Sequence, residues 1–193
     1  MNCRPPVRPA NGWTLVEMVI TVAISTIVMA SLMAMMLFSV KTFKAIGNYG
    51  ELNQTSRYTL DMMNRDFQNA AKVVAGNSSS VTLTNNDGDG FSYSYNSNAT
   101  TLTRYFTNLS GSVETKVLLT NCDAFSFNFY TRVPTNNIPA NLPTNACGPF
   151  FIPVGSDITE TKLINVDWKC SRTIQGAKAN TESVQTAQIA IRN

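Results

Sequence analysis

Residues 12–40 carry the sequence GWTLVEMVITVAISTIVMASLMAMMLFSV, and this stretch decides the fold. From Met18 to Val40 it contains no charged residue, no Pro and no Gly. At about 1.5 Å per residue, a helix over this span would be ~35 Å long, which is enough to cross the hydrocarbon core of a bilayer. The stretch therefore predicts a transmembrane helix over residues 13–40.

A buried helix of a soluble protein and a cleaved signal peptide both fit the apolar stretch less well. A buried helix is rarely so long and so free of charge. A signal peptide has an apolar region of about 7–15 residues that ends at small residues, and no clear Ala-x-Ala site follows here. We therefore expect a retained anchor. The positive charges on either side of the anchor hardly decide its orientation in the membrane, because Arg4 and Arg8 precede it and Lys41 and Lys44 follow it.

The apolar pattern continues beyond the anchor as one face of an amphipathic helix. The residues of this face recur at steps of three or four: Ile46, Tyr49, Leu52, Ser56, Leu60, Met63, Phe67, Ala70 and Val74. We expect one helix over about 14–74 that stops at Gly76, so that residues 41–75 continue the anchor. Gly47 and Gly50 would each weaken it by roughly 1 kcal/mol, and two helices broken there are the alternative.

From residue 76 onward the pattern has a period of two and predicts strands. The expected strands are Val81–Thr84, Phe91–Tyr95, Leu102–Phe106, Phe125–Tyr130, Leu163–Lys169 and Gln188–Arg192. The span Pro134–Pro153 is rich in Pro and is expected to be a surface loop. Neither helix nor sheet could bury its apolar face alone. The predicted fold class is therefore α+β, with a long N-terminal helix packed on an antiparallel β-sheet head over residues 76–193.

Composition argues against several classes of function. The chain of 193 residues has a formal net charge of only +3, and its basic residues form no run, so no nucleic-acid footprint is expected. It contains no His, which removes the usual general base and the commonest metal ligand. We therefore expect no enzyme activity and no cofactor.

The motif at residues 12–17, GWTLVE, follows a short basic leader and precedes the apolar span. In this position it resembles the precursor motif of type IV pilins, in which Gly is followed by an aromatic or apolar residue and then Thr-Leu-x-Glu. The resemblance implies that a prepilin peptidase removes residues 1–12 by cutting after Gly12, and that the new terminal amine of Trp13 is methylated. It also implies that Glu17 pairs with the terminal amine of a neighbouring subunit.

Two features depart from the family pattern. Family members most often begin the mature chain with Phe rather than Trp, and many major pilins have a Pro in the apolar span, which is absent here. The sequence over residues 56–70, SRYTLDMMNRDFQNA, resembles the helix of PilW-type minor pilins and J-type minor pseudopilins. These observations favour a minor subunit over a major one.

The resemblance implies a place in the cell and a set of partners. We expect a single-pass inner-membrane protein with a periplasmic head, which joins other pilin or pseudopilin subunits in a pilus or pseudopilus. The leading hypothesis is a minor structural subunit of a type IV pilus or related filament. The alternatives are a minor pseudopilin of a type II secretion system and, from another class, a signal-anchored surface enzyme or receptor.

Acidic and sulfur side chains raise two further questions. Asp87 and Asp89 are calcium candidates, although Asp-Gly between strands is also a hairpin signal.

Outside the cytoplasm we expect two of Cys122, Cys147 and Cys170 to form a disulfide and one to stay free, whereas Cys3 lies in the leader. The pairings that would staple the Pro-rich loop, Cys147 with Cys170 or Cys122 with Cys147, are favoured.

Overall fold

The computed structural model describes residues 12–133, 146–147, 150–155, 157–174 and 182–191. The leader up to residue 11, most of the span Pro134–Pro153 and Arg192 lie outside these residues. The chain divides into two units, residues 1–44 and 45–193. Helix α1 (Leu15–Asn69) contributes to both and runs through Gly47 and Gly50 without a break, so the prediction of one helix rather than two is confirmed.

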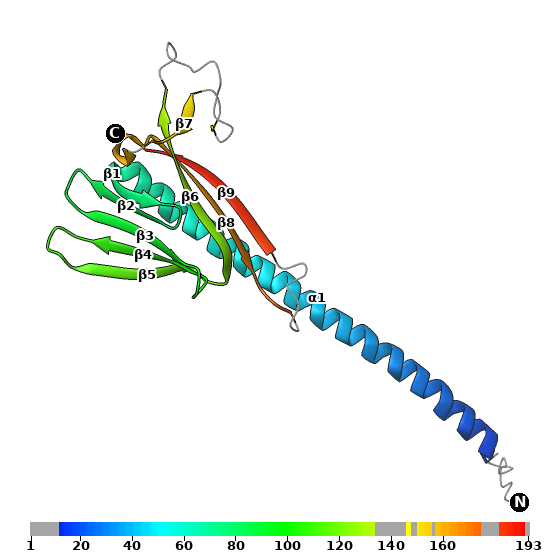
Figure 1. Ribbon diagram of the computed structural model, residues 1–193. Coiled ribbons are helices and arrows are strands. Elements are labelled where there is room, and N and C mark those ends of the chain that lie inside the picture. The colour runs from blue at the N-terminus through cyan, green and yellow to red at the C-terminus, as the bar shows by residue number, and fades with distance from the viewer. Residues whose placement is uncertain (1–11, 134–145, 148–149, 156, 175–181, 192–193) are drawn as a thin grey trace, which may run out of the picture. The chain divides into compact units, whose positions relative to one another are not determined.

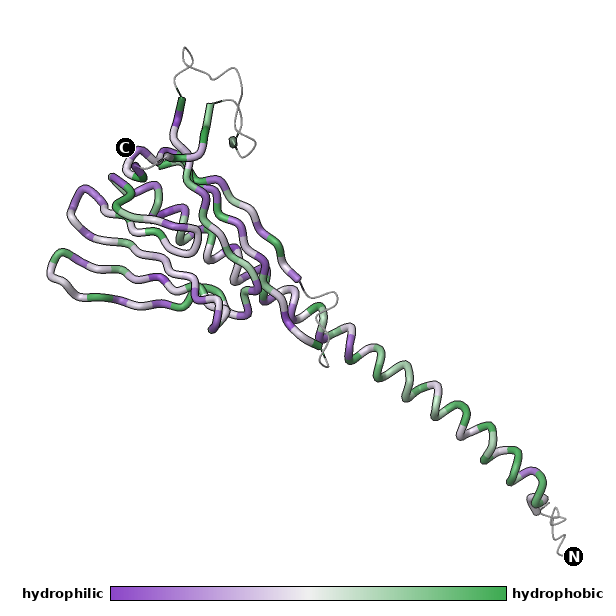
Figure 2. Tube along the Cα trace, in the orientation of Figure 1, coloured by the Kyte–Doolittle hydropathy of each residue, from purple (hydrophilic) through white to green (hydrophobic). Residues whose placement is uncertain are grey.

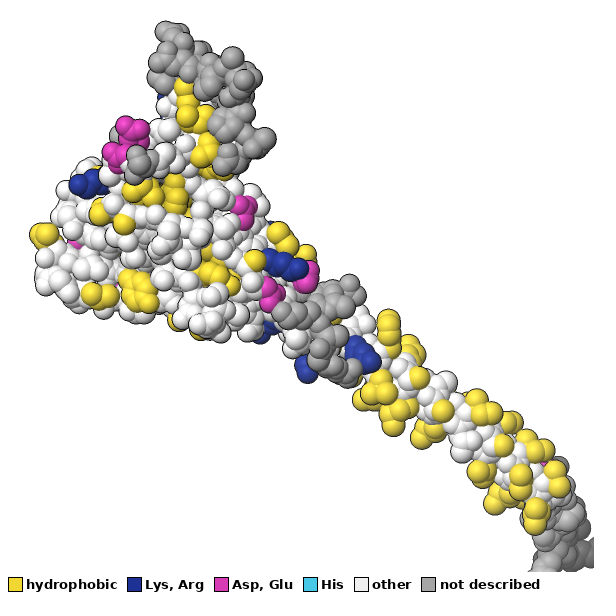
Figure 3. All heavy atoms as spheres, in the orientation of Figure 1, with side chains coloured by type: hydrophobic (Ala, Val, Ile, Leu, Met, Phe, Trp, Pro, Cys, Tyr) yellow, Lys and Arg dark blue, Asp and Glu magenta, His cyan; other side chains and the backbone are white. Residues whose placement is uncertain are grey.

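The first unit is the apolar part of α1. Figure 2 colours most residues along this part of the helix as hydrophobic, and Figure 3 shows hydrophobic side chains along it. Every residue from Gly12 to Phe38 is exposed. None of the most apolar stretch of this helix is buried. The helix is thus long and apolar enough to cross a membrane.

The second unit combines the end of α1 with two antiparallel sheets (Figure 1). The first sheet has the order β1-β2-β3-β4-β5, formed by β1 (Ala70–Asn77), β2 (Ser80–Asn85), β3 (Gly90–Asn96), β4 (Thr101–Thr107) and β5 (Val113–Leu119). The second has the order β7-β6-β8-β9, formed by β6 (Cys122–Arg132), β7 (Phe151–Pro153), β8 (Leu163–Ser171) and β9 (Glu182–Ala190), with a 3-10 turn at Ile158–Glu160. The predicted α+β class is confirmed.

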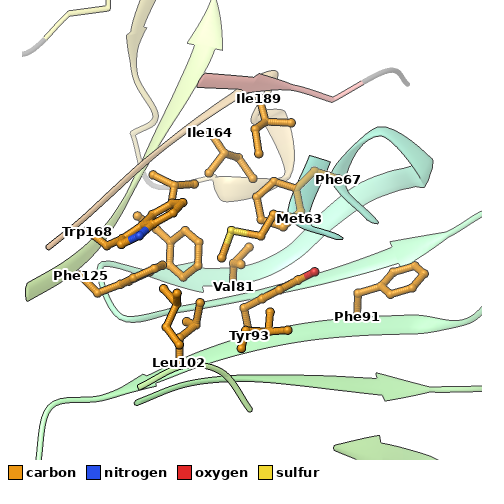
Figure 4. Packing of buried hydrophobic residues seen from close by; sticks show 14 of the residues in the cluster. Met63, Phe67, Val81, Phe91, Tyr93, Leu102, Phe125, Ile164, Trp168 and Ile189 are labelled. Carbon is orange, nitrogen blue, oxygen red and sulfur yellow. The ribbon is translucent and has the colours of Figure 1, made fainter. Parts of the chain in front are cut away.

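One hydrophobic core joins the end of α1 to both sheets. Met63 and Phe67 of α1 are fully buried. Figure 4 shows them between residues of the first sheet, such as Tyr93, and residues of the second sheet, such as Trp168 and Ile164. The Phe67 and Tyr93 rings meet edge to face with centroids 5.5 Å apart. Helix and sheets therefore bury one another's apolar faces.

The structure corrects the expected end of the helix. The helix stops at Asn69, and residues 70–77 form strand β1, so the prediction of helix up to Val74 is wrong. Val73 is fully buried opposite Leu83 of β2, whereas Val74 is 47% exposed. This alternation across a strand pair suits the β-branched side chains, which lose rotamer freedom in a helix.

Other boundaries also differ from the expectation. The predicted single sheet is two sheets, and β1, β5 and β7 were not predicted as strands. β7 lies inside the span expected to be a loop, where it pairs with the end of β6. Of the predicted helix face, Leu52, Ser56, Met63 and Phe67 are buried. Ile46 and Tyr49 are 64% and 54% exposed, so the described residues leave that part of the face uncovered.

Candidate functional site

The helix begins with two residues that cap each other. The Thr14 backbone N–H and its hydroxyl both donate to Glu17 Oε2 at 3.0 Å. In return, the Glu17 backbone N–H donates to Thr14 Oγ1 at 3.3 Å. This reciprocal arrangement is a capping box, in which the N-cap side chain and the third helical residue satisfy backbone donors that have no partner inside the helix. Glu17 therefore holds the first turn of its own helix.

Glu17 was predicted as the acid that pairs with a neighbouring subunit, and its role in the cap was not predicted. The signal was present, because Thr followed three residues later by Glu before an apolar run is the signature of a capping box. The motif at residues 12–17 thus has a local structural role in addition to the role that the family resemblance implies. Any test of Glu17 has to separate the two.

The bond between Gly12 and Trp13 lies just outside the helix. Gly12, Trp13 and Thr14 have no regular secondary structure, all three are exposed, and the Trp13 side chain is 70% exposed. A Cβ added at Gly12 would meet no atom within 4 Å. The described part of the chain therefore sets no steric demand for Gly at this position.

The polar side chains within the apolar helix are satisfied locally. Each Ser and Thr hydroxyl from Thr21 to Thr42 donates to a backbone carbonyl three or four residues earlier, at 2.7–3.0 Å. In a bilayer an unsatisfied hydroxyl would be costly, since no water is present to pair with it. These hydroxyls therefore do not oppose an apolar environment around residues 18–42.

In the second unit, a buried ion pair fixes α1 to the first sheet. Arg104 of β4 donates to Asp66 through Nε at 2.6 Å and through Nη2 at 3.1 Å, which is a two-point contact. The Tyr93 hydroxyl of β3 donates to the same carboxylate at 2.5 Å. The Arg104 and Asp66 side chains are only 11% and 5% exposed. Desolvation and the Asp66 charge raise the pKa of Tyr93 well above its ordinary value.

A second polar contact joins the same helix to the other sheet. Trp168 Nε1 of β8 donates to Ser56 Oγ at 3.4 Å, in a region where both residues are buried. Asp66 and Ser56 therefore connect one helix to two sheets. This cluster of Asp66, Arg104 and Tyr93 was not predicted, because the three residues are far apart along the chain.

The calcium candidates lie in the hairpin between β2 and β3. Asp89 accepts from Asn85 Nδ2 at 3.3 Å and from the Leu109 backbone N–H at 3.0 Å, so its carboxylate is used within the loops. Among the described residues, no group of three His, Cys, Asp or Glu side chains could hold a metal ion. Asp87 and Asp89 therefore act as turn residues in this structure.

The cysteines are arranged differently from the favoured pairings. Cys122 and Cys170 are direct partners across β6 and β8. Cys147 lies elsewhere, where its Sγ accepts from Gln188 Nε2 at 3.0 Å. The three side chains are free thiols in this structure. The structure brings together the one pair that the sequence analysis did not favour.

Comparison with known proteins adds no relative. No family model matches this sequence, and no curated protein matches it.

Proposed function

We propose that this protein is a minor structural subunit of a type IV pilus or a related filament, cut after Gly12 and assembled through its N-terminal helix. The observation that carries the proposal is the first unit of the chain. An exposed Gly12–Trp13 bond precedes a capped, mostly apolar helix whose residues are all exposed up to Phe38. A single acid, Glu17, interrupts it.

Such a helix needs an apolar environment on all sides. A membrane supplies this environment before assembly, and the helices of neighbouring subunits supply it afterwards. Glu17 is costly in either place unless a cation pairs with it. The amine freed at Trp13 of a neighbouring subunit is that cation in the proposed filament. The inner membrane, a prepilin peptidase and other pilin or pseudopilin subunits are therefore the proposed partners, with the head in the periplasm.

In this proposal the head lies outside the membrane. Its hydrophobic core closes around the end of α1, which is consistent with a structural role. Ile46 and Tyr49, which the sheets leave exposed, form a small apolar surface with Ala45 and Gly50. We propose that this surface contacts neighbouring subunits, because it continues the helix that enters the filament.

The first experiment tests the cut. The full precursor is produced in membranes with and without a prepilin peptidase, and the N-terminal peptide is identified by mass spectrometry. We expect a chain that begins with methylated Trp13. Gly12→Val should block the cut without disturbing the fold, because a Cβ there meets nothing within 4 Å. Gly47→Ala, which also has free space, is the control. Normal assembly of an uncut Gly12→Val chain would refute the proposal, and an unprocessed native chain would favour a signal-anchored receptor or enzyme.

The second experiment separates pairing from capping at Glu17. Glu17→Gln keeps an oxygen acceptor for the Thr14 donors but removes the charge. Thr14→Val keeps the charge but removes the hydroxyl of the cap, at a cost of about 1 kcal/mol. Membrane insertion should be normal in both variants. Incorporation into filaments, measured by immunoblot of filament and membrane fractions, should fall about tenfold or more for Glu17→Gln only, because a charged hydrogen bond contributes about 1.5–3 kcal/mol. The opposite ranking would assign Glu17 to the cap alone.

A further inference from the structure

Cys122 and Cys170 lie against each other in the core of the head. Cys122 is the first residue of β6, and Cys170 is the next-to-last residue of β8. They are register partners in the antiparallel pair, so their side chains leave the sheet on the same face. Their exposed fractions are 0% and 1%, and both belong to the hydrophobic core.

The backbone hydrogen bonds around Cys122 and Cys170 show whether they form a hydrogen-bonded or a non-hydrogen-bonded pair of the antiparallel sheet. The Ser171 N–H donates to the Asn121 carbonyl at 3.0 Å, whereas the Cys122 N–H donates away from β8, to the Thr100 carbonyl at 2.9 Å. Cys122 and Cys170 are therefore a non-hydrogen-bonded pair, the closer of the two kinds, with Cα atoms about 4.5 Å apart. Disulfides span Cα separations of about 4.4–6.8 Å. A register pair of this kind therefore falls within the range of spacings that a disulfide requires.

The two sulfur atoms also interact chemically. The hydrogen bond with Cys170, together with burial, raises the pKa of Cys122. The same hydrogen bond lowers the pKa of Cys170.

Cys147 cannot take part in this bond without a large rearrangement. Its sulfur contacts Gln188, which is paired with Asn165 of β8. Asn165 and Cys170 are five positions apart on the same strand, which corresponds to about 17 Å. Cys147, held by Gln188, therefore lies at the opposite end of β8 from Cys170, whereas bonded cysteines have Cα atoms within about 7 Å of each other.

We propose that Cys122 and Cys170 form an intramolecular disulfide when the protein folds in an oxidising compartment, and that Cys147 remains a thiol. The oxidant is a donor disulfide, from a thiol–disulfide oxidoreductase or oxidised glutathione. The thiolate of one of the two cysteines attacks one donor sulfur and releases the other as a thiolate. The thiolate of the other cysteine then attacks the sulfur of the first and releases the second donor sulfur. The two protons lost by the cysteines convert the donor to two thiols, so the donor gains two electrons.

The bond forms during folding, because a donor cannot reach side chains that are 0% and 1% exposed in the folded head.

The position of the disulfide gives it a structural role. β5 ends at Leu119 and β6 begins at Cys122, so the chain passes here from one sheet to the other, with Asn121 at a φ of 55°. The disulfide would tie this crossing to β8. It would close a loop of roughly 50 residues and raise the melting temperature by roughly 10 °C.

Peptide mapping tests the proposal directly. The full chain with Cys3→Ser is unfolded and refolded in detergent with oxidised and reduced glutathione, alkylated under denaturing conditions without reductant, and cut with trypsin. Cleavage after Lys116, Arg132, Lys162, Lys169 and Arg172 separates the three cysteines. We expect residues 117–132 linked to residues 170–172, and residues 133–162 alkylated at Cys147.

A control variant keeps the test decisive. Cys147→Ser should give the same linked peptides and the same difference in melting temperature of roughly 10 °C between oxidised and reduced protein. Cys170→Ser should lose both. A linked peptide that contains residues 133–162, or alkylation of all three cysteines after oxidative refolding, would overturn the proposal. The outcome is independent of whether the chain assembles into a filament.

Discussion

The buried contact between Arg104 and Asp66 gives the sharpest prediction of stability. Arg104→Met removes the guanidinium but keeps much of the side-chain volume. It leaves the Asp66 carboxylate 5% exposed, with the Tyr93 hydroxyl still donating to it but without its cation. Breaking a buried ion pair from one side costs about 3–5 kcal/mol, because an uncompensated charge stays in the core.

The magnitude can be expressed as a shift in denaturant midpoint. With a slope of about 2 kcal/mol per molar urea, the expected loss moves the midpoint down by roughly 1.5–2.5 M. Lys169→Met is the matched control. The Lys169–Glu182 pair has a similar separation of 2.9 Å, but its side chains are 40% and 43% exposed. Its loss should cost less than about 1 kcal/mol.

Tryptophan fluorescence can follow the unfolding of the head. The chain has two Trp residues, and Trp168 is 2% exposed in the core. In a Trp13→Phe background, the emission of Trp168 reports the head alone, with the full chain held in a non-denaturing detergent. If Arg104→Met and Lys169→Met shift the midpoint by the same small amount, the buried pair does not fix the helix to the sheet.

The head also allows predictions about pH, packing and solubility. The pKa of Tyr93 is raised on folding, so its contribution to stability is complete below its unfolded pKa of about 10 and is lost as the pH rises above that value; Tyr93→Phe should flatten the fall in stability between pH 10 and 12 in urea titrations. Gly76→Val should lower the free energy of unfolding by about 1–3 kcal/mol, because a Cβ would come within 2.6 Å of Phe129 Cζ and 2.9 Å of Ile158 Cδ1. Residues 41–193 should be soluble and monomeric in light scattering, and aggregation under oxidising conditions would show that the exposed end of the helix needs a partner.

The features that the sequence determined are those encoded by neighbours along the chain. The apolar run of residues 18–40 predicts a long exposed helix, because its composition leaves no polar face. Alternation and turn residues predict β2, β3 and β4, whose hairpins close within a few residues. β5 carries a weaker version of this signal, since Val113, Thr115 and Val117 alternate with charged residues, and it was missed because both of its faces are largely exposed.

Only the tertiary structure decided the features that depend on distant partners. Residues 70–77 are a strand rather than helix because β2 pairs with them and buries Val73. Asp66 is a core residue because Arg104 and Tyr93, 38 and 27 positions away, converge on it. The partner of Cys122 follows from the register of β6 against β8, and a shift of one residue would have turned the facing side chains to the opposite face. A local pattern can specify an element, but long-range pairing is chosen by which faces bury together.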